Sequence, residues 1–450
     1  MNDIYTLSDG TVYSERKNIR SFSAHSLEEY SATISEEKIE RLQGIAQRLK
    51  GLKVLELNST AQGGGVAEML YSSIPFLNAL GIEAEWKVIN GHRDFFECTK
   101  RFHNLLQGMR GPFTREMKQV YVNHLLECAG NNIVENSPDI VIIHDPQPML
   151  LCRYLKREGE RWFWRCHIDI EPAVRSQNGL LSLLNNWITD YDAAIFSASR
   201  YVFPPWLIPK FIIPPFIDPL SEKNRELSQD EITRVLAKYE LDPEVPMITQ
   251  IGRFDPWKGL DRTIATYRIV REERNCQLVI AGGFASDDPE GERIIEDIRS
   301  KTKDDKDVHI LNLSLSDRLE NYLEVNALQR AASIIMQPSI REGFGLVVTE
   351  ALWKGKPVIA SNVGGIPFQI KKGSTGYFYE NPRRTAQKII YLLENKRAAE
   401  RIGKKGRRYI QEHFLIVDRI TDCLTSLDIV INSAFDKKRL AKCVTSFYPW

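Results

Sequence analysis

Short apolar runs alternate with amphipathic segments along the first half of the chain. Glu36–Leu49 carries apolar residues at helical spacing, and a second helix is predicted from about Val66 to Leu80. One run, Ile140–Ile143, is apolar on both faces, as in a buried parallel strand. The predicted strands are Lys53–Leu57, Ala84–Val88, Ile140–Ile143, Phe163–His167 and Ala193–Ser197. This alternation predicts a parallel sheet with helical crossovers.

A proline-rich stretch separates this half from a second one. Residues 201–220 hold six prolines, a density that excludes a helix and a central strand, so we expect a connector here. The same alternation then returns. The predicted strands are Met247–Ile251, Gln277–Ala281, Val308–Leu311, Ile334–Met336 and Pro357–Ala360, with helices such as Leu346–Lys354 and Arg383–Glu394 between them. The last helical segment, Ile416–Phe435, is expected to pack back on the first half. The 450 residues therefore predict two α/β halves and a returning tail.

Charge and cysteine content narrow the class of protein. Lys and Arg number 60 and Asp and Glu 59, so there is no basic excess to bind nucleic acid. No apolar run approaches the roughly 18 residues of a membrane span, and the first residues lack an apolar signal segment. The seven cysteines are scattered without a C-x-x-C pair. We therefore expect a cytoplasmic protein without disulfides, membrane contact or nucleic-acid partners.

A glycine-rich turn marks the first candidate site. Three glycines, residues 63–65, follow a predicted strand and open a predicted helix. Glycine lets backbone N–H groups approach an anion, and a helix N-terminus adds partial positive charge. The pattern is neither G-x-G-x-x-G nor a P-loop. We expect Gly64 and Gly65 to contact a ligand, while the simpler alternative is a flexible turn.

The loop after Met247–Ile251 carries two cationic side chains. Arg253 and Lys258 lie at the carboxyl end of a predicted parallel strand, where ligands of open α/β sheets bind. An arginine and a lysine there can converge on one anion. Taken alone, a solvated pair of charges is the simpler interpretation.

Residues 341–350 change that interpretation. Glu342 and Glu350 have E-x7-E spacing around a glycine loop that leads into a helix. A carboxylate can accept two hydrogen bonds from vicinal sugar hydroxyls, and the loop and helix start offer free N–H groups. The element predicts a site that holds a sugar, a phosphate and a ribose together.

These two motifs resemble those of retaining glycosyltransferase family 4. Two further segments, residues 281–283 and 361–367, are typical of the same family. The resemblance implies an α/β protein of the GT-B type, with two facing Rossmann-like domains, a cleft between them and a C-terminal helix returning to the first domain. Residues 1–215, with 416–450 packing back, would bind the acceptor, and residues 216–415 the nucleotide-sugar donor.

The resemblance also implies roles for single residues. Arg253 and Lys258 would neutralise the leaving diphosphate, and Glu350 would bind the ribose hydroxyls. Glu342 would contact the transferred sugar, and His167 corresponds to the family's active-site histidine. The implied catalytic residues are His167, Arg253, Lys258 and Glu342, and the implied donor-binding residues are Gly64, Gly65, Arg253, Lys258, Glu342, Gly343, Phe344, Gly345, Leu346 and Glu350.

The first half resembles more narrowly the subgroup of that family that forms trehalose. Residues 58–68, 102–108, 144–148 and 164–169 carry this resemblance. It implies retaining transfer of glucose from a nucleoside-diphosphate glucose (NDP-glucose) to free glucose. The residues expected to bind the acceptor are His103, His144, Asp145 and Gln147. For residues 144–148, a turn stabilised by aspartate and proline is an equal alternative.

Several questions stay open at this point. Asp190 with Asp192, and Asp305 with Asp307, have D-x-D form but lie at a strand start and in a charged run, so we predict no metal site. No tightly bound cofactor is expected, and Mg²⁺ would enter only with the free nucleotide. The partners are a nucleotide sugar and a small sugar, and a homodimer is left open. Alternative functions are another family 4 transfer, trehalose phosphorolysis, and a non-enzymatic nucleotide-sugar-binding regulator.

Overall fold

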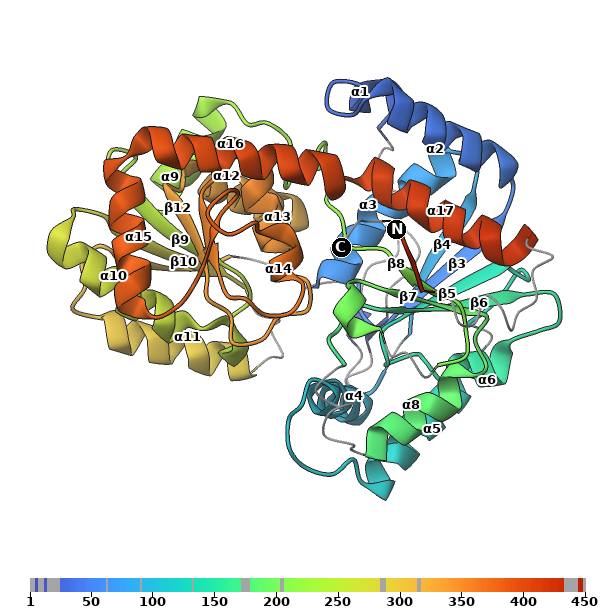
Figure 1. The fold of residues 1–450 in the computed structure, drawn as a ribbon. Coiled ribbons are helices and arrows are strands. Elements are labelled where there is room, and N and C mark those ends of the chain that lie inside the picture. Colours follow the sequence, from blue (N-terminus) through green and yellow to red (C-terminus); the bar gives the residue numbers. More distant parts are fainter. Residues whose placement is uncertain are drawn as a thin grey trace. The chain divides into compact units, whose positions relative to one another are not determined.

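The chain divides into two compact units, each with its own parallel sheet. The computed structural model describes residues 5–6, 12–13, 25–61, 64–89, 91–131, 133–170, 179–202, 206–283, 289–313, 317–432 and 444–447. Unit 1 comprises residues 1–215 and 416–450, and unit 2 comprises residues 216–415. Figure 1 shows that helices cover the strands in both units. Among the described helices, none has the length and apolar character needed to cross a bilayer.

Unit 1 is built on a seven-stranded sheet with the order β15-β8-β7-β6-β5-β3-β4. Its strands are β3 (Lys53–Asn58), β4 (Glu83–Val88), β5 (Ile140–His144), β6 (Arg161–Cys166), β7 (Ala193–Phe196), β8 (Lys210–Ile212) and β15 (Val444–Ser446). A short antiparallel pair, β1 (Tyr5–Thr6) with β2 (Val12–Tyr13), is separate. The five predicted strands are confirmed, with ends that differ by one or two residues.

The helices of unit 1 pack on both faces of this sheet. They are α1 (Leu27–Tyr30), α2 (Glu36–Arg48), α3 (Gly65–Ala79), α4 (Arg93–Leu106), α5 (Arg115–Gly130), α6 (Leu151–Leu155), α8 (Gly179–Ile188) and α17 (Ile416–Asn432), with a 3₁₀ turn η2 (Ser199–Tyr201). In Figure 1, α2 and α17 lie on one face, while α4, α5 and α8 lie on the other.

The C-terminal helix α17 is fixed to α2 by its charges as well as by its apolar face. Lys38 Nζ lies 2.8 Å from Asp418 Oδ2, and Arg48 Nη2 lies 3.2 Å from Asp428 Oδ2. These contacts confirm the predicted return of this helix to the first half. The predicted end at Phe435 falls outside the described residues.

The proline-rich stretch contains a strand, so the prediction that excluded a central strand was wrong. β8 pairs in parallel with β7 on one side and with β15 on the other. Pro209 and Pro214 flank β8 and lie outside its paired residues. Proline cannot donate to a ladder, so its place at the two ends leaves the three paired residues free to bond.

Unit 2 is built on a six-stranded parallel sheet with the order β11-β10-β9-β12-β13-β14. Its strands are β9 (Met247–Ile251), β10 (Gln277–Gly282), β11 (Val308–Asn312), β12 (Ile334–Gln337), β13 (Val358–Ala360) and β14 (Tyr377–Phe378). Its helices are α9 (Gln229–Lys238), α10 (Leu260–Glu273), α11 (Pro289–Thr302), α12 (Arg318–Ala331), α13 (Leu346–Trp353), α14 (Ile366–Gln369), α15 (Pro382–Glu394) and α16 (Lys396–His413), with a 3₁₀ turn η3 (Pro256–Lys258). A buried core that includes Ile280, Tyr267 and Ile389 joins the sheet to α10 and α15. Two parallel sheets with flanking helices confirm the predicted α/β fold class.

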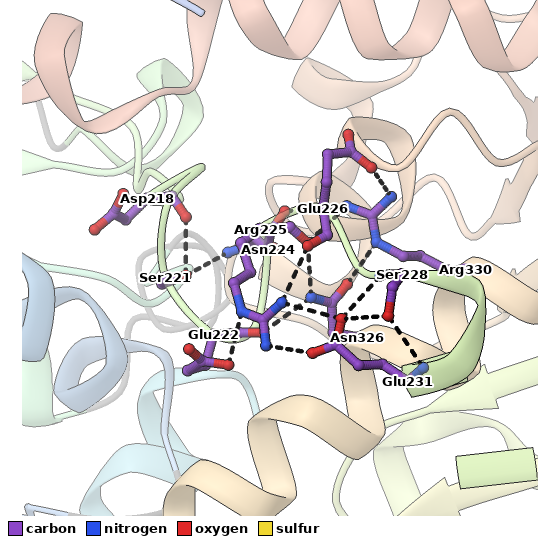
Figure 2. Close-up of polar contacts among 10 residues, drawn as sticks. All are labelled: Asp218, Ser221, Glu222, Asn224, Arg225, Glu226, Ser228, Glu231, Asn326 and Arg330. Atoms are coloured by element: carbon purple, nitrogen blue, oxygen red, sulfur yellow. Dashed lines mark hydrogen bonds and ion pairs between the residues drawn. The ribbon is translucent and has the colours of Figure 1, made fainter. Parts of the chain in front are cut away.

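Polar contacts fix the start of unit 2, residues 218–231, against α12 (Figure 2). The guanidinium of Arg225 pairs with Glu222 at 2.9 Å and with Glu231 at 2.7 Å. Asn326 of α12 donates to the carbonyls of Glu222 and Arg225, both at 2.9 Å. Ser228 and Glu231 form a capping box that starts α9. The segment is therefore held in place before the first strand of unit 2 begins.

Candidate functional site

The loop after β9 is shaped by one glycine and one aspartate. The Asp255 side chain accepts a hydrogen bond from the Trp257 N–H at 2.8 Å and starts η3. Gly259 has a φ of +68°, and a Cβ there would lie 2.2 Å from the Pro338 carbonyl oxygen. Only glycine fits this conformation at this distance. The loop can therefore pass directly against the segment that follows β12.

Lys258 and Glu342, which come from different motifs, form an ion pair. Lys258 Nζ lies 2.9 Å from Oε1 and 2.7 Å from Oε2 of the carboxylate. Ser339 donates to Glu342 Oε2 at 3.1 Å, and Gln337 donates to Ser339 Oγ at 3.1 Å. The structure thus brings together two of the predicted donor-site residues, and the Ser339 hydroxyl helps to fix the position of the Glu342 carboxylate.

The glycine loop before α13 is held by close backbone packing. Gly345 has a φ of +82° and precedes the first residue of α13, Leu346. Gln369 donates to the Phe344 carbonyl at 2.6 Å. The N–H groups of the first turn of a helix have no partner within the helix. The Val348 N–H in the first turn of α13 donates to the Gly345 carbonyl at 2.9 Å. Contact of the Phe344, Gly345 and Leu346 N–H groups with a phosphate or sugar oxygen stays a prediction.

Arg253 differs from Lys258 in its surroundings. Its side chain is 60% exposed, and its guanidinium lies 3.7 Å from Asp255 Oδ2. At that distance the two groups form an ion pair without a hydrogen bond. The structure therefore presents Arg253 to solvent on the loop that also carries Lys258.

Glu350 is buried, and both of its carboxylate oxygens have partners. Lys223 Nζ lies 2.9 Å from Oε1, and Gln329 Nε2 lies 3.3 Å from Oε2. A carboxylate has about four lone-pair sites, so it can accept further hydrogen bonds from hydroxyls. Sequence reasoning missed Lys223, because no motif marks a lysine in residues 218–231 as the partner of a helix residue far along the chain.

In unit 1, His144 and His167 are bonded to each other. His144 Nδ1 lies 3.0 Å from His167 Nε2, and the two rings are nearly parallel. His144 Nε2 bonds to the carboxylate of Glu56, and His167 Nδ1 lies 3.3 Å from Ser197 Oγ. Sequence reasoning missed Glu56 and Ser197. The available signal for Glu56 was an acidic residue inside the apolar run of β3.

Asp145 ties the ends of β5 and β6 together. Its φ is +59°, an uncommon conformation for a residue other than glycine. Its Oδ1 accepts from the His167 N–H at 2.8 Å, and its carbonyl accepts from Trp164 Nε1 at 2.9 Å.

Burial raises the pKa of the Asp145 carboxyl to about 6. Burial, and then the positive charge of Arg165, hold the pKa of His167 well below its usual range. His167 is therefore neutral near pH 7.

The other predicted residues of unit 1 lie at helix ends and in a turn. Gly65 is the first residue of α3, with Gly64 before it, and His103 lies in the last turn of α4. Gln147 is partly buried in the turn after β5, and its Oε1 has no hydrogen-bond partner among the described residues. The structure links His144, Asp145 and His167 by hydrogen bonds. Gln147 lies two positions after Asp145 in the same turn.

The two D-x-D pairs are engaged with cations of the protein. The distances are 2.9 Å for Arg153 to Asp190, 2.7 Å for Lys156 to Asp192, 2.9 Å for Arg268 to Asp305 and 2.7 Å for Arg271 to Asp307. Within the described part of the chain, no group of three or more His, Cys, Asp or Glu side chains has the arrangement of a metal site.

Two family models match the chain, one in each half. "Trehalose synthase, N-terminal domain" matches residues 56–203, and "Glycosyl transferases group 1" matches residues 231–409. The first range contains the linked side chains Glu56, His144, His167 and Ser197. The second contains Arg253, Lys258, Glu342 and Glu350.

Known proteins are similar over most of the chain. A trehalose synthase of Pyrococcus horikoshii is 43% identical over 423 residues, which cover 91% of this chain and 99% of that protein. A trehalose phosphorylase of Pleurotus pulmonarius is 32% identical over 78% of this chain, but the match covers only 53% of that protein. The solved sucrose-phosphate synthase of Thermosynechococcus elongatus aligns with a TM-score of 0.62 at 19% identity, over 83% of this chain and 98% of that one. This structural likeness extends to the fold alone.

Proposed function

Because the chain belongs to the trehalose synthase family of group 1 glycosyltransferases, we propose that it transfers glucose, with retention, from an NDP-glucose to free glucose. The products would be trehalose and the nucleoside diphosphate, and the reaction would be reversible. The observation that carries the proposal is the 43% identity to a trehalose synthase over 91% of the chain. That match extends through the sequence of both units, so it supports the choice of acceptor as well as donor.

The barrier of such a transfer is the departure of the diphosphate from the anomeric carbon. Negative charge grows on the leaving oxygen, so cations fixed at that oxygen stabilise the transition state more than the ground state. Lys258 and Arg253 would supply this charge, with the N–H groups at the start of α13. Glu342 would accept hydrogen bonds from hydroxyls of the transferred glucose, and Glu350 from the ribose. Lys258 is paired with Glu342, so a bound diphosphate would share or take over this cation.

Retention would follow from attack on the face that the diphosphate leaves. The acceptor hydroxyl would form the new bond to the anomeric carbon and pass its proton to the departing phosphate oxygen. No protein nucleophile is then needed. Asp145, Gln147 and His103 would bind acceptor hydroxyls. Gln147 Oε1, which has no hydrogen-bond partner in the described part of the chain, offers one acceptor for them.

Phosphorolysis of trehalose is the second candidate. It is favoured by the 32% identity to a trehalose phosphorylase, although this chain spans about half of that protein's length. In that reaction inorganic phosphate takes the place of the nucleoside diphosphate as the group that accepts or donates glucose. A cationic site made by Lys258 and Arg253 would serve either anion.

One experiment separates these functions. The purified protein is incubated with UDP-, ADP- or GDP-glucose and free glucose, and separately with trehalose and inorganic phosphate, and the products are identified by NMR. We expect a non-reducing glucose disaccharide in the first set, dependent on both substrates. Glucose phosphate formed from trehalose and phosphate, without nucleotide, would favour the phosphorylase. Nucleotide release that ignores glucose but responds to a lipid or a phosphosugar would overturn the acceptor assignment.

A further inference from the structure

Four buried side chains form a continuous line of hydrogen bonds in unit 1. Glu56 of β3 bonds to His144 of β5, His144 bonds to His167 after β6 at 3.0 Å, and His167 bonds to Ser197 after β7 at 3.3 Å. The exposed fractions are 3% for Glu56, 2% for His144, 7% for His167 and 1% for Ser197. β3, β5, β6 and β7 are neighbours in the sheet, so the line crosses it from strand to strand.

The line has a defined direction when Glu56 is ionised. A carboxylate only accepts hydrogen bonds, and a neutral histidine has one donor nitrogen and one acceptor nitrogen. His144 must then donate from Nε2 to Glu56 and accept at Nδ1 from His167 Nε2. His167 Nδ1 is left without hydrogen and accepts from the Ser197 hydroxyl. Every group in the line is satisfied, and both histidines carry hydrogen on Nε2.

A buried cation, Arg165, lies on the same face of the sheet as His144. Arg165 is paired in register with His144, so the two side chains share a face. Burial raises the pKa of Cys423 in α17 to about 12, and the charges of Arg165 and Glu56 also act on it, in opposite directions. The Nε and Nη2 groups of Arg165 are buried without hydrogen-bond partners among the described residues. The buried carboxylate of Glu56 can balance this charge, because isolated buried charges are costly.

We propose that Glu56 and Ser197 are positioning residues that fix the tautomer of His167 through this line. His167 then offers a bare Nδ1 as an acceptor, while its Nε2 is occupied by His144. A sugar hydroxyl that reaches the His167 ring must donate to Nδ1 and take the place of the Ser197 hydroxyl. The effect of this line on catalysis rests on the proposed glucosyl transfer, whereas the tautomer of His167 is inferred from the hydrogen bonds alone. His144 belongs to the line, since both of its ring nitrogens are used inside the protein.

NMR of the unmodified protein tests the tautomer directly. The histidines are labelled with ¹⁵N, and the signals of interest are assigned by their loss in His144→Gln and His167→Gln. We expect hydrogen on Nε2 and none on Nδ1 for both residues near neutral pH, without substrate. Hydrogen on Nδ1 of His167, or a doubly protonated His167 ring, would overturn the proposal.

Variants test whether the line matters for the reaction. In Glu56→Leu the anchor is lost, so we expect a mixture of tautomers at His144 and a fall in kcat on the order of 100-fold, the scale of a misplaced catalytic group. We expect a smaller fall in kcat for Glu56→Gln, because the amide oxygen of glutamine can still accept a hydrogen bond from His144. Glu160→Leu is the matched control. Glu160 is another buried acid of unit 1, bonded to Trp162 at 2.9 Å and outside the line.

The outcomes separate this inference from the proposed function. If Glu56→Leu keeps the native tautomers and kcat, or if Glu160→Leu lowers kcat equally in a folded protein, the positioning role is wrong. If the protein makes no trehalose, the tautomer in the unmodified chain still tests the arrangement. Should Glu56→Leu fail to fold by circular dichroism, Glu56→Gln and the NMR of the unmodified protein decide the question.

Discussion

Lys258 and Glu342 lie 84 positions apart in the chain and form an ion pair, with Nζ 2.9 and 2.7 Å from the two carboxylate oxygens. Their side chains are 17% and 11% exposed. A lysine on an open loop would be free to serve a ligand alone, whereas this lysine also neutralises a largely buried carboxylate. If the proposed function holds, removing Lys258 has two consequences, one for the reaction and one for the stability of unit 2.

Lys258→Ala should lower both activity and stability, and Arg253→Ala should lower activity alone. In the proposed reaction each variant would remove a positive charge from beside the leaving diphosphate, so we expect kcat to fall by ~100-fold. Lys258→Ala also leaves Glu342 without its cation, at a cost of about 1–3 kcal/mol in the free energy of unfolding. Arg253, with a side chain 60% exposed, serves as the matched control in urea unfolding. Equal stability of the two variants would contradict the structural importance of the pair, and near-native kcat in either would contradict the assigned role.

Glu350→Gln should raise the KM for the donor more than it lowers kcat. Ribose contacts are similar in the ground state and the transition state, so their loss weakens donor binding equally in both states. The measurement is the initial rate with NDP-glucose varied at saturating glucose. Glu324→Gln is the control, because Glu324 is also a buried acid of unit 2 but pairs with Lys238. A KM that rises as much in Glu324→Gln as in Glu350→Gln would mean that the effect is structural.

The alternation of apolar runs and helices was enough to predict the parallel sheets, because burial on both faces leaves a clear local pattern. β9 was predicted residue for residue. The prediction failed at β8, whose pairing depends on β7 and on β15 near the other end of the chain. No local pattern can report such a partner, and the flanking prolines concealed the strand.

The candidate site was predictable where the chemistry lies in loops with glycine. Lys258 and Glu342 were marked by their motifs, but their contact with each other was not. Glu56 and Lys223 were missed for a common reason. Each acts through a residue on another element: Glu56 meets His144 because β3 is beside β5, and Lys223 meets Glu350 because residues 218–231 lie beside α12 and α13. Strand order and segment packing are properties of the folded chain.

Gly364→Ala should disturb the Glu342 loop, and Gly373→Ala should not. Both glycines have positive φ, +57° and +76°, so alanine costs about 1–2 kcal/mol of backbone strain at either position. Only at Gly364 would the added Cβ meet backbone, 2.0 Å from the Glu342 carbonyl oxygen, whereas nothing lies within 4 Å at Gly373. We therefore expect a larger loss of stability and a higher donor KM in Gly364→Ala. Indistinguishable kinetics for the two variants would show that the position of this loop does not govern donor binding.

Lys354→Met should change how the stability of the protein depends on pH. Lys354 is buried at the end of α13 and donates to Asn224 Oδ1 at 3.1 Å, and burial lowers its pKa from 10.5 to about 7. Between these two values the unfolded chain binds a proton that the folded chain does not, so the free energy of unfolding rises with pH. Below about pH 7 both states carry the charge, and the cost of burying it is present in full.

The measurement for Lys354→Met is urea unfolding at a series of pH values from about 6 to about 10. The variant has no charge to bury, so we expect it to have a larger free energy of unfolding than the unmodified protein at the lowest pH values. We also expect its free energy of unfolding to rise less as pH increases. Part of the rise should persist, because burial also lowers the pKa of Lys356 to about 8. Lys404→Met, at an exposed position of α16, is the control and should follow the unmodified protein. Parallel curves for Lys354→Met and the unmodified protein would mean that Lys354 is charged in the folded state throughout this range.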